Sequence, residues 1–211
     1  MNSHKFITYG LPLLAYLLGS IPWGLVLTRL FAIADIRRHG SGNIGATNVA
    51  RVAGPALGLA TLVADFLKGW APVVLASYLD LPQAGGAELY AAALALLAVL
   101  GHLFPVYTRL RGGGKGVATA AGGFAALAPL AVLIALGVFV LALALTRRVS
   151  AGSLAAAAAL PPAVLSTTGS AVFCAGAVMA ATLIFIRHAG NIRRLLAGRE
   201  PPFRLGNKPD R

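Results

Sequence analysis

Cysteine, acidic side chains and charged residues in general are all scarce in this 211-residue sequence. The single cysteine, Cys174, has no partner, which excludes an internal disulfide and a cysteine-based metal site. The six acidic residues and four histidines are scattered without metal-ligand spacing, so neither a metal nor another cofactor is implied. Charged residues make up 11% of the chain, which is too little polar surface to cover a water-soluble globule.

Long apolar runs take up most of the chain. Hydrophobic residues account for 58% of it and the mean hydropathy is +0.79. A helix needs about 20 apolar residues to cross the hydrocarbon core of a bilayer. The first run is too long for the core of a signal peptide, so we count it as a span. We predict an all-α integral membrane protein, a single domain over 1–211, with seven transmembrane helices near 6–31, 53–79, 88–107, 117–129, 130–146, 152–167 and 170–187.

The run from 117 to 146 allows either one long helix or two short ones. Pro129 and the pair Gly122 and Gly123 favour a break and a hairpin of two spans. A single span would place Arg147 and Arg148 outside, which the accumulation of basic residues in cytoplasmic loops disfavours. We therefore predict two spans here, and seven in total.

The distribution of basic residues also predicts the orientation. With the N terminus outside and the C terminus cytoplasmic, sixteen of the eighteen lysines and arginines fall on the cytoplasmic side. Lys5 falls outside, Lys68 lies within a span, and the outer loop 80–88 carries acidic residues instead. The net charge of +12 thus follows the inner membrane face and its anionic lipids. Nucleic acid is not indicated, because no soluble domain with stacking aromatics is present, and no obligate protein partner is evident.

Three polar stretches on this predicted cytoplasmic side are denser in glycine, asparagine, serine and threonine than simple turns require. The first is "RRHGSGNIGATNVAR" at 37–51, and the second is "RLRGGGKGVAT" at 109–119. The third is split between "RRVSAGS" at 147–153 and "RHAGNIRRLLAGRE" at 187–200. Because the topology places all of them at one face, we expect them to converge on one site.

The second stretch indicates what that site holds. Its glycines permit positive-φ turns whose amides point into one concavity, and Lys115 adds a positive charge. A helix N terminus follows, which also favours an anion, so phosphate is the expected guest. The pattern is not a nucleotide P-loop, since Gly116 and Val117 follow the lysine and no strand precedes it. A plain glycine hinge between two spans is the alternative.

The sequence contains no constellation of residues for nucleophilic catalysis. Asp65 and Lys68, in "ADFLKGW", lie three apart on one helix face within a span. Charges inside the membrane are usually paired. We expect these two residues to neutralise each other in a structural role, with catalysis as the less favoured alternative.

The motifs "GSGNIGATNVAR", "GHLFPVYTRLRGGGKGVAT" and "RHAGNIRRLLAGRE" resemble the three signature regions of the bacterial acyl-phosphate:glycerol-3-phosphate acyltransferases, membrane enzymes of phospholipid synthesis. The resemblance extends over nearly the whole chain. It implies a seven-helix bundle in the bacterial cytoplasmic (inner) membrane, with its active site at the cytoplasmic face. It also implies transfer of a fatty acyl group from acyl phosphate to the 1-hydroxyl of glycerol 3-phosphate, without acyl-CoA or acyl carrier protein as direct donor. Family members usually have a lysine where this chain has Gly112, and Arg111 is a candidate to supply that charge.

The resemblance also implies the site residues. The expected catalytic residues are Ser41, Arg51, Lys115, Ser153, His188 and Asn191. The expected substrate-binding residues are Asn43, Thr47, Asn48, Gly112, Gly113, Gly114, Gly116 and Thr119. We assign the phosphate of glycerol 3-phosphate to Arg51, Lys115 and Ser153, and its hydroxyls to Ser41, His188 and Asn191. The amides of the glycine loop and Thr119 are expected to hold the acyl-phosphate phosphate.

Two questions about the chemistry stay open at this stage. His188 is a candidate general base, since its pKa range suits that work. The substrate's own phosphate is the competing proton acceptor, and we favour it. A transporter or binding protein for an organic phosphate is the alternative function. It would be expected to show an internal repeat and polar residues near the membrane midplane, and the sequence shows neither.

Overall fold

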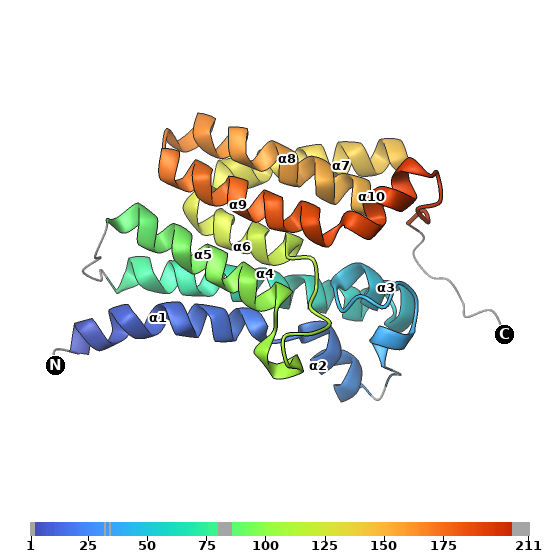
Figure 1. Ribbon diagram of the computed structural model, residues 1–211, viewed down its shortest axis with the longest axis horizontal. Helices are drawn as coiled ribbons and strands as arrows, with labels where there is room; N and C mark the ends of the chain where they lie inside the picture. Colours follow the sequence, from blue (N-terminus) through green and yellow to red (C-terminus); the bar gives the residue numbers. More distant parts are fainter. Residues whose placement is uncertain (1–2, 32, 34, 80–85, 204–211) are drawn as a thin grey trace.

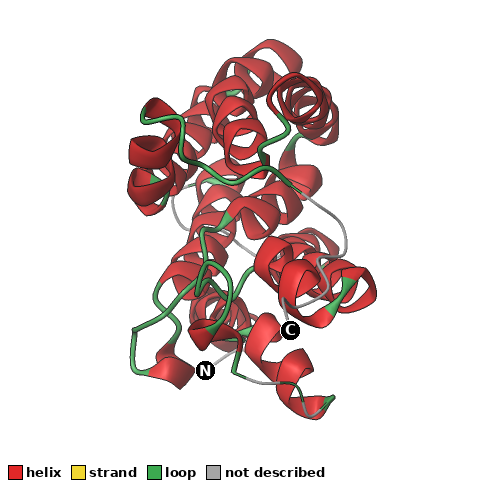
Figure 2. Cartoon of the chain, turned by 90° about the vertical axis from the view of Figure 1, so that its right-hand side faces the viewer, coloured by secondary structure: helices red, strands yellow, loops and turns green. Residues whose placement is uncertain are grey.

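The computed structural model describes residues 3–31, 33, 35–79 and 86–203, and every regular element in these ranges is a helix (Figures 1 and 2). The elements are α1 (Ser3–Ser20), α2 (Trp23–Leu30), η1 (Ile36–Arg38), α3 (Ala46–Ala53), α4 (Pro55–Tyr78), α5 (Ala87–Leu103), η2 (Val106–Thr108), α6 (Val117–Leu127), α7 (Pro129–Thr146), α8 (Val149–Thr168), α9 (Ala171–Arg187) and α10 (Ala189–Leu196). Most of the predicted outer loop, and the basic residues Arg204, Lys208 and Arg211, lie outside the described residues.

Four of the described helices are long and apolar enough to cross a membrane, and up to six candidates result if each of two bent helix pairs is one span. The remaining apolar helix, α6, has 11 residues. At about 1.5 Å per residue it covers about 16 Å, against a hydrocarbon core of about 30 Å. The lengths of the helices therefore support a multi-pass membrane protein, and the count of seven spans stays a prediction.

The first predicted span, 6–31, is two helices rather than one. α1 ends at Ser20, α2 begins at Trp23, and the two are bent by 50°. Pro22 causes the break, because it lacks an N–H and disfavours a helical conformation at the residue before it. α2 thereby turns toward the first polar stretch. A Cβ atom on Gly24 would meet the carbonyl oxygen of Ile44, so this close approach requires a glycine.

The run from 117 to 146 is divided as predicted, but only one of the two expected causes applies. α6 ends at Leu127, and α7 begins with Pro129 in its first turn. Gly122 and Gly123 are not at the break. They lie inside α6, where a Cβ atom on Gly122 would meet the carbonyl oxygen of Phe66 on α4. The glycine pair lets α6 pack closely against neighbouring helices, as small residues do in membrane bundles.

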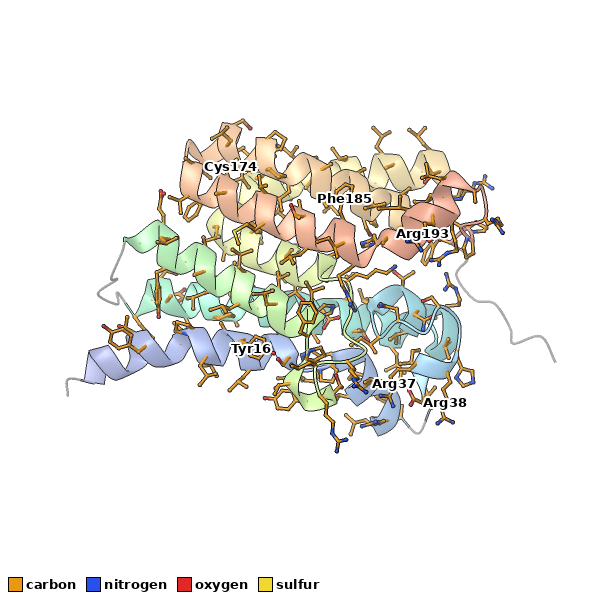
Figure 3. All side chains as sticks on the ribbon, in the orientation of Figure 1. Tyr16, Arg37, Arg38, Cys174, Phe185 and Arg193 are labelled. Atoms are coloured by element: carbon orange, nitrogen blue, oxygen red, sulfur yellow. The ribbon has the colours of Figure 1, made fainter. Side chains whose placement is uncertain are left out.

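The bundle has two sides with α6 between them (Figure 1). α1, α4 and α5 form one side, and α7, α8 and α9 form the other. Phe124 of α6 is fully buried in the largest apolar cluster, together with Val164 of α8 and Ile184 of α9. The short helices α2, α3 and α10 and the segment 104–116 all lie at one end, where Figure 3 shows Arg37, Arg38 and Arg193. All three polar stretches therefore meet at that end.

Candidate active site

The first polar stretch folds around the side chain of Asn48. Its Nδ2 donates hydrogen bonds to the carbonyl oxygens of Ile36, His39 and Asn43, at 3.2, 3.0 and 2.9 Å. Its Oδ1 accepts one from the backbone N–H of Ser41 at 2.9 Å. The residue is buried. We expected Asn48 to contact substrate. Its side-chain amide is instead hydrogen-bonded to backbone groups of the loop, because these groups need partners where the chain turns. Asn48 therefore shapes the loop.

Other members of this stretch remain available to a ligand. The side chain of Ser41 is exposed, and Thr47 and Arg51 on α3 are half-buried. Asn43 is partly used, because its Oδ1 accepts a hydrogen bond from the backbone N–H of Gly45 at 2.9 Å. The cation of Arg51 is close enough to the second stretch to influence Lys115 electrostatically.

The glycines of the second stretch serve two different purposes. Gly112 and Gly116 have φ angles of +67° and +84°, in the left-handed region that favours glycine. Gly113 and Gly114 do not, and are required for close packing. A Cβ atom on Gly113 would meet the carbonyl oxygen of Leu103, and one on Gly114 would meet the imidazole ring of His102.

The backbone around Gly113 and Gly114 is held from two sides. Arg187, the last residue of α9, donates from Nη2 to the carbonyl oxygen of Gly113 at 2.7 Å. It also donates from Nε to the carbonyl oxygen of Gly114 at 3.1 Å, and its guanidinium lies 6.0 Å from the ring centre of Phe104. On the other side, the backbone N–H of Gly114 donates to the carbonyl oxygen of His102 at 3.1 Å.

These contacts correct two expectations about phosphate binding. The amide of Gly114 is not free for an anion, because it is bonded to α5. Thr119 is fully buried and its Oγ1 has no hydrogen-bond partner among the described residues, so this hydroxyl does not line the site. The remaining donors include Lys115 and the first turn of α6, which begins after Gly116 and carries the positive end of the helix dipole.

Lys115 joins the second stretch to the third. Its Nζ donates to Oδ1 of Asn191, on α10, at 2.6 Å. Nδ2 of Asn191 donates in turn to Oε1 of Glu200 at 2.5 Å. The predicted convergence of Lys115 with Asn191 is present, although the two residues are 76 positions apart.

Glu200 is buried and accepts hydrogen bonds from several side chains, although it is not among the predicted site residues. Its Oε1 also accepts from Oγ of Ser150 at 2.7 Å, and its Oε2 accepts from Nε of Arg194 at 2.7 Å. Its backbone carbonyl accepts from Nε of Arg148 at 3.1 Å. One signal was available, because Glu200 follows a segment whose charged residues are all arginines. The carboxylate fixes Asn191, and through it Lys115.

The ammonium of Lys115 is in an unfavourable setting for a cation. Desolvation is the main cause that lowers its pKa, to about 8, and Arg194, Arg187 and Arg51 lower it further. Glu200 opposes this shift. A cation held among other cations is stabilised when an anion binds, so this geometry favours a phosphate ligand.

His188 and Ser153 complete the third stretch. His188 lies at the junction of α9 and α10, is 2% exposed, and its Nδ1 is 2.8 Å from the carbonyl oxygen of Ile184. Since a carbonyl only accepts, Nδ1 carries the proton, and Nε2 of the neutral ring is an acceptor. Ser153 is buried on α8, one turn from Ser150, and therefore lies on the same helix face as that partner of Glu200.

Known proteins resemble this chain in both sequence and fold. The model of the glycerol-3-phosphate acyltransferase family matches residues 9–198. The chain is 50% identical to the glycerol-3-phosphate acyltransferase of Syntrophotalea carbinolica over 196 residues, covering 93% of this chain and 97% of the relative. The corresponding enzyme of Trichlorobacter lovleyi is 49% identical, with coverages of 90% and 94%.

The chain belongs to the glycerol-3-phosphate acyltransferase family.

Two solved structures extend the comparison to three dimensions. They are crystal structures of PlsY, an integral membrane glycerol 3-phosphate acyltransferase, in a glycerol 3-phosphate form and a lysophosphatidic acid form. The first has a TM-score of 0.86 at 36% identity and covers 93% of this chain and 96% of that one. The second has a TM-score of 0.84 at 35% identity, with coverages of 94% and 96%. This acyltransferase is thus an all-helical, multi-pass membrane enzyme of phospholipid synthesis.

The family match covers the predicted site residues but not Glu200. Every residue predicted to act in the site lies within the matched range of 9–198, whereas Glu200 lies just beyond that range.

The predicted pairing of Asp65 with Lys68 is confirmed, with Nζ 2.8 Å from Oδ1 and both side chains buried. Within the described part of the chain no three histidine, cysteine, aspartate or glutamate side chains are grouped for metal binding.

Proposed function

We propose that this acyltransferase moves a fatty acyl group from an acyl phosphate to the 1-hydroxyl of glycerol 3-phosphate, giving 1-acylglycerol 3-phosphate (lysophosphatidic acid) and inorganic phosphate. The observation that carries the proposal is the place of Lys115. Its ammonium is hydrogen-bonded to Asn191, and its pKa is lowered chiefly by desolvation and further by Arg194, Arg187 and Arg51. Both proposed substrates carry phosphate, and a charge-assisted hydrogen bond to phosphate is the interaction that this cation lacks.

The acyl phosphate is favoured as donor by what the site offers. An acyl phosphate is already activated, because phosphate is a good leaving group, so the enzyme mainly has to hold two phosphorylated substrates in reacting geometry. Among the described residues no serine or cysteine is hydrogen-bonded to a histidine. The Sγ of Cys174 is directed to the carbonyl oxygen of Pro161, and Nδ1 of His188 to that of Ile184. Direct transfer without a covalent acyl-enzyme agrees with this inventory.

The residues around Lys115 divide between the two substrates. Arg51, Lys115 and Ser153 bind the phosphate of glycerol 3-phosphate. Ser41, His188 and Asn191 orient its hydroxyls, assisted by Asn43 and Thr47. The acyl-phosphate phosphate binds at the first turn of α6, where Gly112 and Gly116 supply the turns, and Arg111 takes the place of the lysine usual in the family.

In the reaction, the 1-hydroxyl oxygen of glycerol 3-phosphate attacks the acyl carbon. The new ester C–O bond forms, and the bond between the acyl carbon and the phosphate oxygen breaks, so its electron pair leaves with inorganic phosphate. The hydroxyl proton passes to a substrate phosphate. His188 takes a hydrogen bond from a substrate hydroxyl at Nε2 and positions it, because its Nδ1 is already bound to the helix.

The topology completes the proposal. Residues 1–211 form one transmembrane domain in the bacterial cytoplasmic membrane, with seven spans, the N terminus outside and the C terminus cytoplasmic. The positive-inside rule supports this orientation, since arginines gather at the end of the bundle that holds the site. The substrates then arrive at the cytoplasmic face of an enzyme that is surrounded by membrane lipid and works without an obligate protein partner.

The experiment that tests the function uses the purified enzyme in detergent. Palmitoyl phosphate and glycerol 3-phosphate are supplied together and separately, and released phosphate and 1-acylglycerol 3-phosphate are measured. We expect release of phosphate to require both substrates and to match the ester formed in a one-to-one ratio. Phosphate released from palmitoyl phosphate alone at the same rate would overturn the proposal, since it would show hydrolysis rather than transfer.

A further inference from the structure

A cluster of charged and polar side chains is buried directly beneath the glycine loop, outside the proposed site. Asp65 and Lys68 lie on α4 and His102 on α5, each 5% exposed or less. Lys68 Nζ is 2.8 Å from Oδ1 of Asp65, and Nδ1 of His102 is 3.6 Å from the same oxygen. A buried ion pair is often no more stabilising than apolar residues of the same volume. Stability alone therefore gives no reason for this cluster.

The cluster is connected on one side to the break between α1 and α2. Besides its ion pair, Lys68 donates from Nζ to the carbonyl oxygen of Ile21 at 2.8 Å. Ile21 immediately precedes Pro22, the residue at which the chain bends by 50° into α2. α2 in turn packs on the first polar stretch through the contact of Gly24 with Ile44. Lys68 thus holds the bend that places this wall of the site.

On the other side the cluster is connected to the glycine loop. The carbonyl oxygen of His102 accepts the hydrogen bond from the Gly114 amide at 3.1 Å. The imidazole ring lies so close beneath Gly114 that a Cβ atom there would meet Nε2, Cε1 and Cδ2 of the ring. Gly114 directly precedes Lys115. The ring of His102 therefore packs directly against the loop that carries Lys115.

We propose that Asp65, Lys68 and His102 are positioning residues, which fix the separation between the first polar stretch and the glycine loop across the glycerol 3-phosphate site. They touch no substrate. Asp65 forms the ion pair with Lys68, and the ring of His102 packs beside its carboxylate at 3.6 Å, which is beyond hydrogen-bond distance. The residues that contact Ile21 and Gly114 therefore pack in one buried cluster. The inference rests on the proposed function to the extent that it assigns glycerol 3-phosphate to Lys115 and Arg51.

The first test uses a charge-neutral double variant, Asp65→Asn with Lys68→Met. Removing both charges leaves no unpaired buried ion, so the protein is expected to fold. Misplacement by about 1 Å can cost on the order of 10²-fold in rate, so we expect kcat/KM for glycerol 3-phosphate to fall by about 10- to 100-fold. Most of the loss should be a raised KM. A double variant with the wild-type KM for glycerol 3-phosphate would overturn the proposal.

The second test separates positioning from a general loss of stability. The readout is the rise in the melting temperature of the detergent-solubilised enzyme on adding glycerol 3-phosphate alone. In the double variant this rise should be largely lost at a concentration that gives a clear rise in the wild-type protein. A merely structural role would lower the melting temperature equally with and without ligand and leave the rise in place, which would contradict us.

A matched control lies at the opposite end of the bundle. Oγ of Ser170 donates to Oε2 of Glu88 at 2.6 Å, far from the glycine loop in the fold. The double variant Ser170→Ala with Glu88→Gln also removes a polar contact between helices. It should lower the melting temperature while keeping the wild-type KM and the ligand-induced rise. If it raises KM as much as the Asp65 and Lys68 variant does, the effect is not specific to the cluster and the proposal is wrong.

A third test asks whether His102 supports the loop through direct contact. Gly114→Ala should strongly reduce activity, because the added methyl group meets the ring. In a His102→Ala background the ring is gone, so Gly114→Ala should cost at least several-fold less. Equal losses in the two backgrounds would show that the ring and the loop are not coupled.

The melting-temperature test is independent of the identity of the acyl donor. If the enzyme proves to use a different donor, the ligand-induced rise with glycerol 3-phosphate still reports on the cluster. If the wild-type protein shows no rise with glycerol 3-phosphate but does transfer acyl groups, the assignment of that substrate to Lys115 fails, and the positioning proposal fails with it.

Discussion

Lys115 Nζ lies 2.6 Å from Oδ1 of Asn191, and this hydrogen bond joins the glycine loop to the helix that follows α9. Asn191 is fixed in turn by Glu200, so the lysine is held in place before any substrate arrives. Preorganised charge of this kind needs no rearrangement when an anion binds or when charge develops in the reaction.

The first prediction concerns the contribution of Lys115 to phosphate binding. Lys115→Ala removes a charge-assisted contact worth roughly 1.5 to 3 kcal/mol, so kcat/KM for glycerol 3-phosphate should fall by about one to two orders of magnitude. Steady-state kinetics in detergent measures this. Arg193→Ala is the control, because it removes an exposed cation from the same end of the bundle. Similar losses in the two variants would mean that general electrostatic attraction, rather than a defined contact, explains the effect.

The second prediction is a pH dependence that follows from the lowered pKa of Lys115, about 8. As the pH rises through this value the free enzyme loses the ammonium, so kcat/KM should fall on the alkaline side. Below it, kcat/KM should stay level until the phosphate of glycerol 3-phosphate takes up a proton near pH ~6. Lys115→Arg should remove the alkaline limb, since guanidinium stays charged. A wild-type profile that stays level up to the ordinary lysine range, about 10.4, would contradict the assignment.

The third prediction distinguishes positioning by His188 from general-base catalysis. His188→Ala should raise KM for glycerol 3-phosphate and leave the shape of the pH profile unchanged, because the substrate phosphate takes the proton. A general base would instead account for about 10²- to 10⁴-fold in rate. It would also account for an ionisation near pH 4, because desolvation and the neighbouring Lys115 lower the pKa of His188 to about 4. Loss of such a limb from the kcat/KM profile of the variant would make His188 the base.

The fourth prediction concerns topology and uses single cysteines in a Cys174→Ser background. Arg38→Cys and Arg193→Cys lie at the end that holds the site, and Tyr78→Cys and Thr168→Cys lie at the other end; all four positions are exposed. A membrane-impermeant thiol reagent should label positions 78 and 168 in intact cells. It should label positions 38 and 193 only after the membrane is opened. Labelling of 38 and 193 from opposite sides would exclude a single site formed by the three polar stretches.

Much of this arrangement was accessible from the sequence because it depends on local chemistry. Pro129 predicts the division between α6 and α7, and the arginine-rich, glycine-rich stretches predict one polar end. The same proline rule applied to Pro22 would have predicted the bend between α1 and α2. We missed it because the apolar run continues through the proline without a change in composition.

The remainder could not be predicted because it depends on contacts between distant residues. The local sequence does not show that Arg187 donates hydrogen bonds to the carbonyl oxygens of a loop more than 70 positions earlier. Nor does it show that the side-chain amide of Asn48 is hydrogen-bonded within its own loop. In the sequence Glu200 differs from a surface acid only in following an arginine-rich segment, which does not show that it is buried. Its role appears only when Ser150 and Asn191 are brought to it by the packing of α8 against α9.

The measurement that tests the account most directly compares acyl donors. Purified enzyme is given glycerol 3-phosphate with either palmitoyl phosphate or palmitoyl-CoA at equal concentration, and the initial rate of 1-acylglycerol 3-phosphate formation is measured. We predict turnover with palmitoyl phosphate and essentially none with palmitoyl-CoA, because the proposed site places the leaving phosphate of an acyl phosphate at the first turn of α6. Comparable rates with the two donors would contradict it.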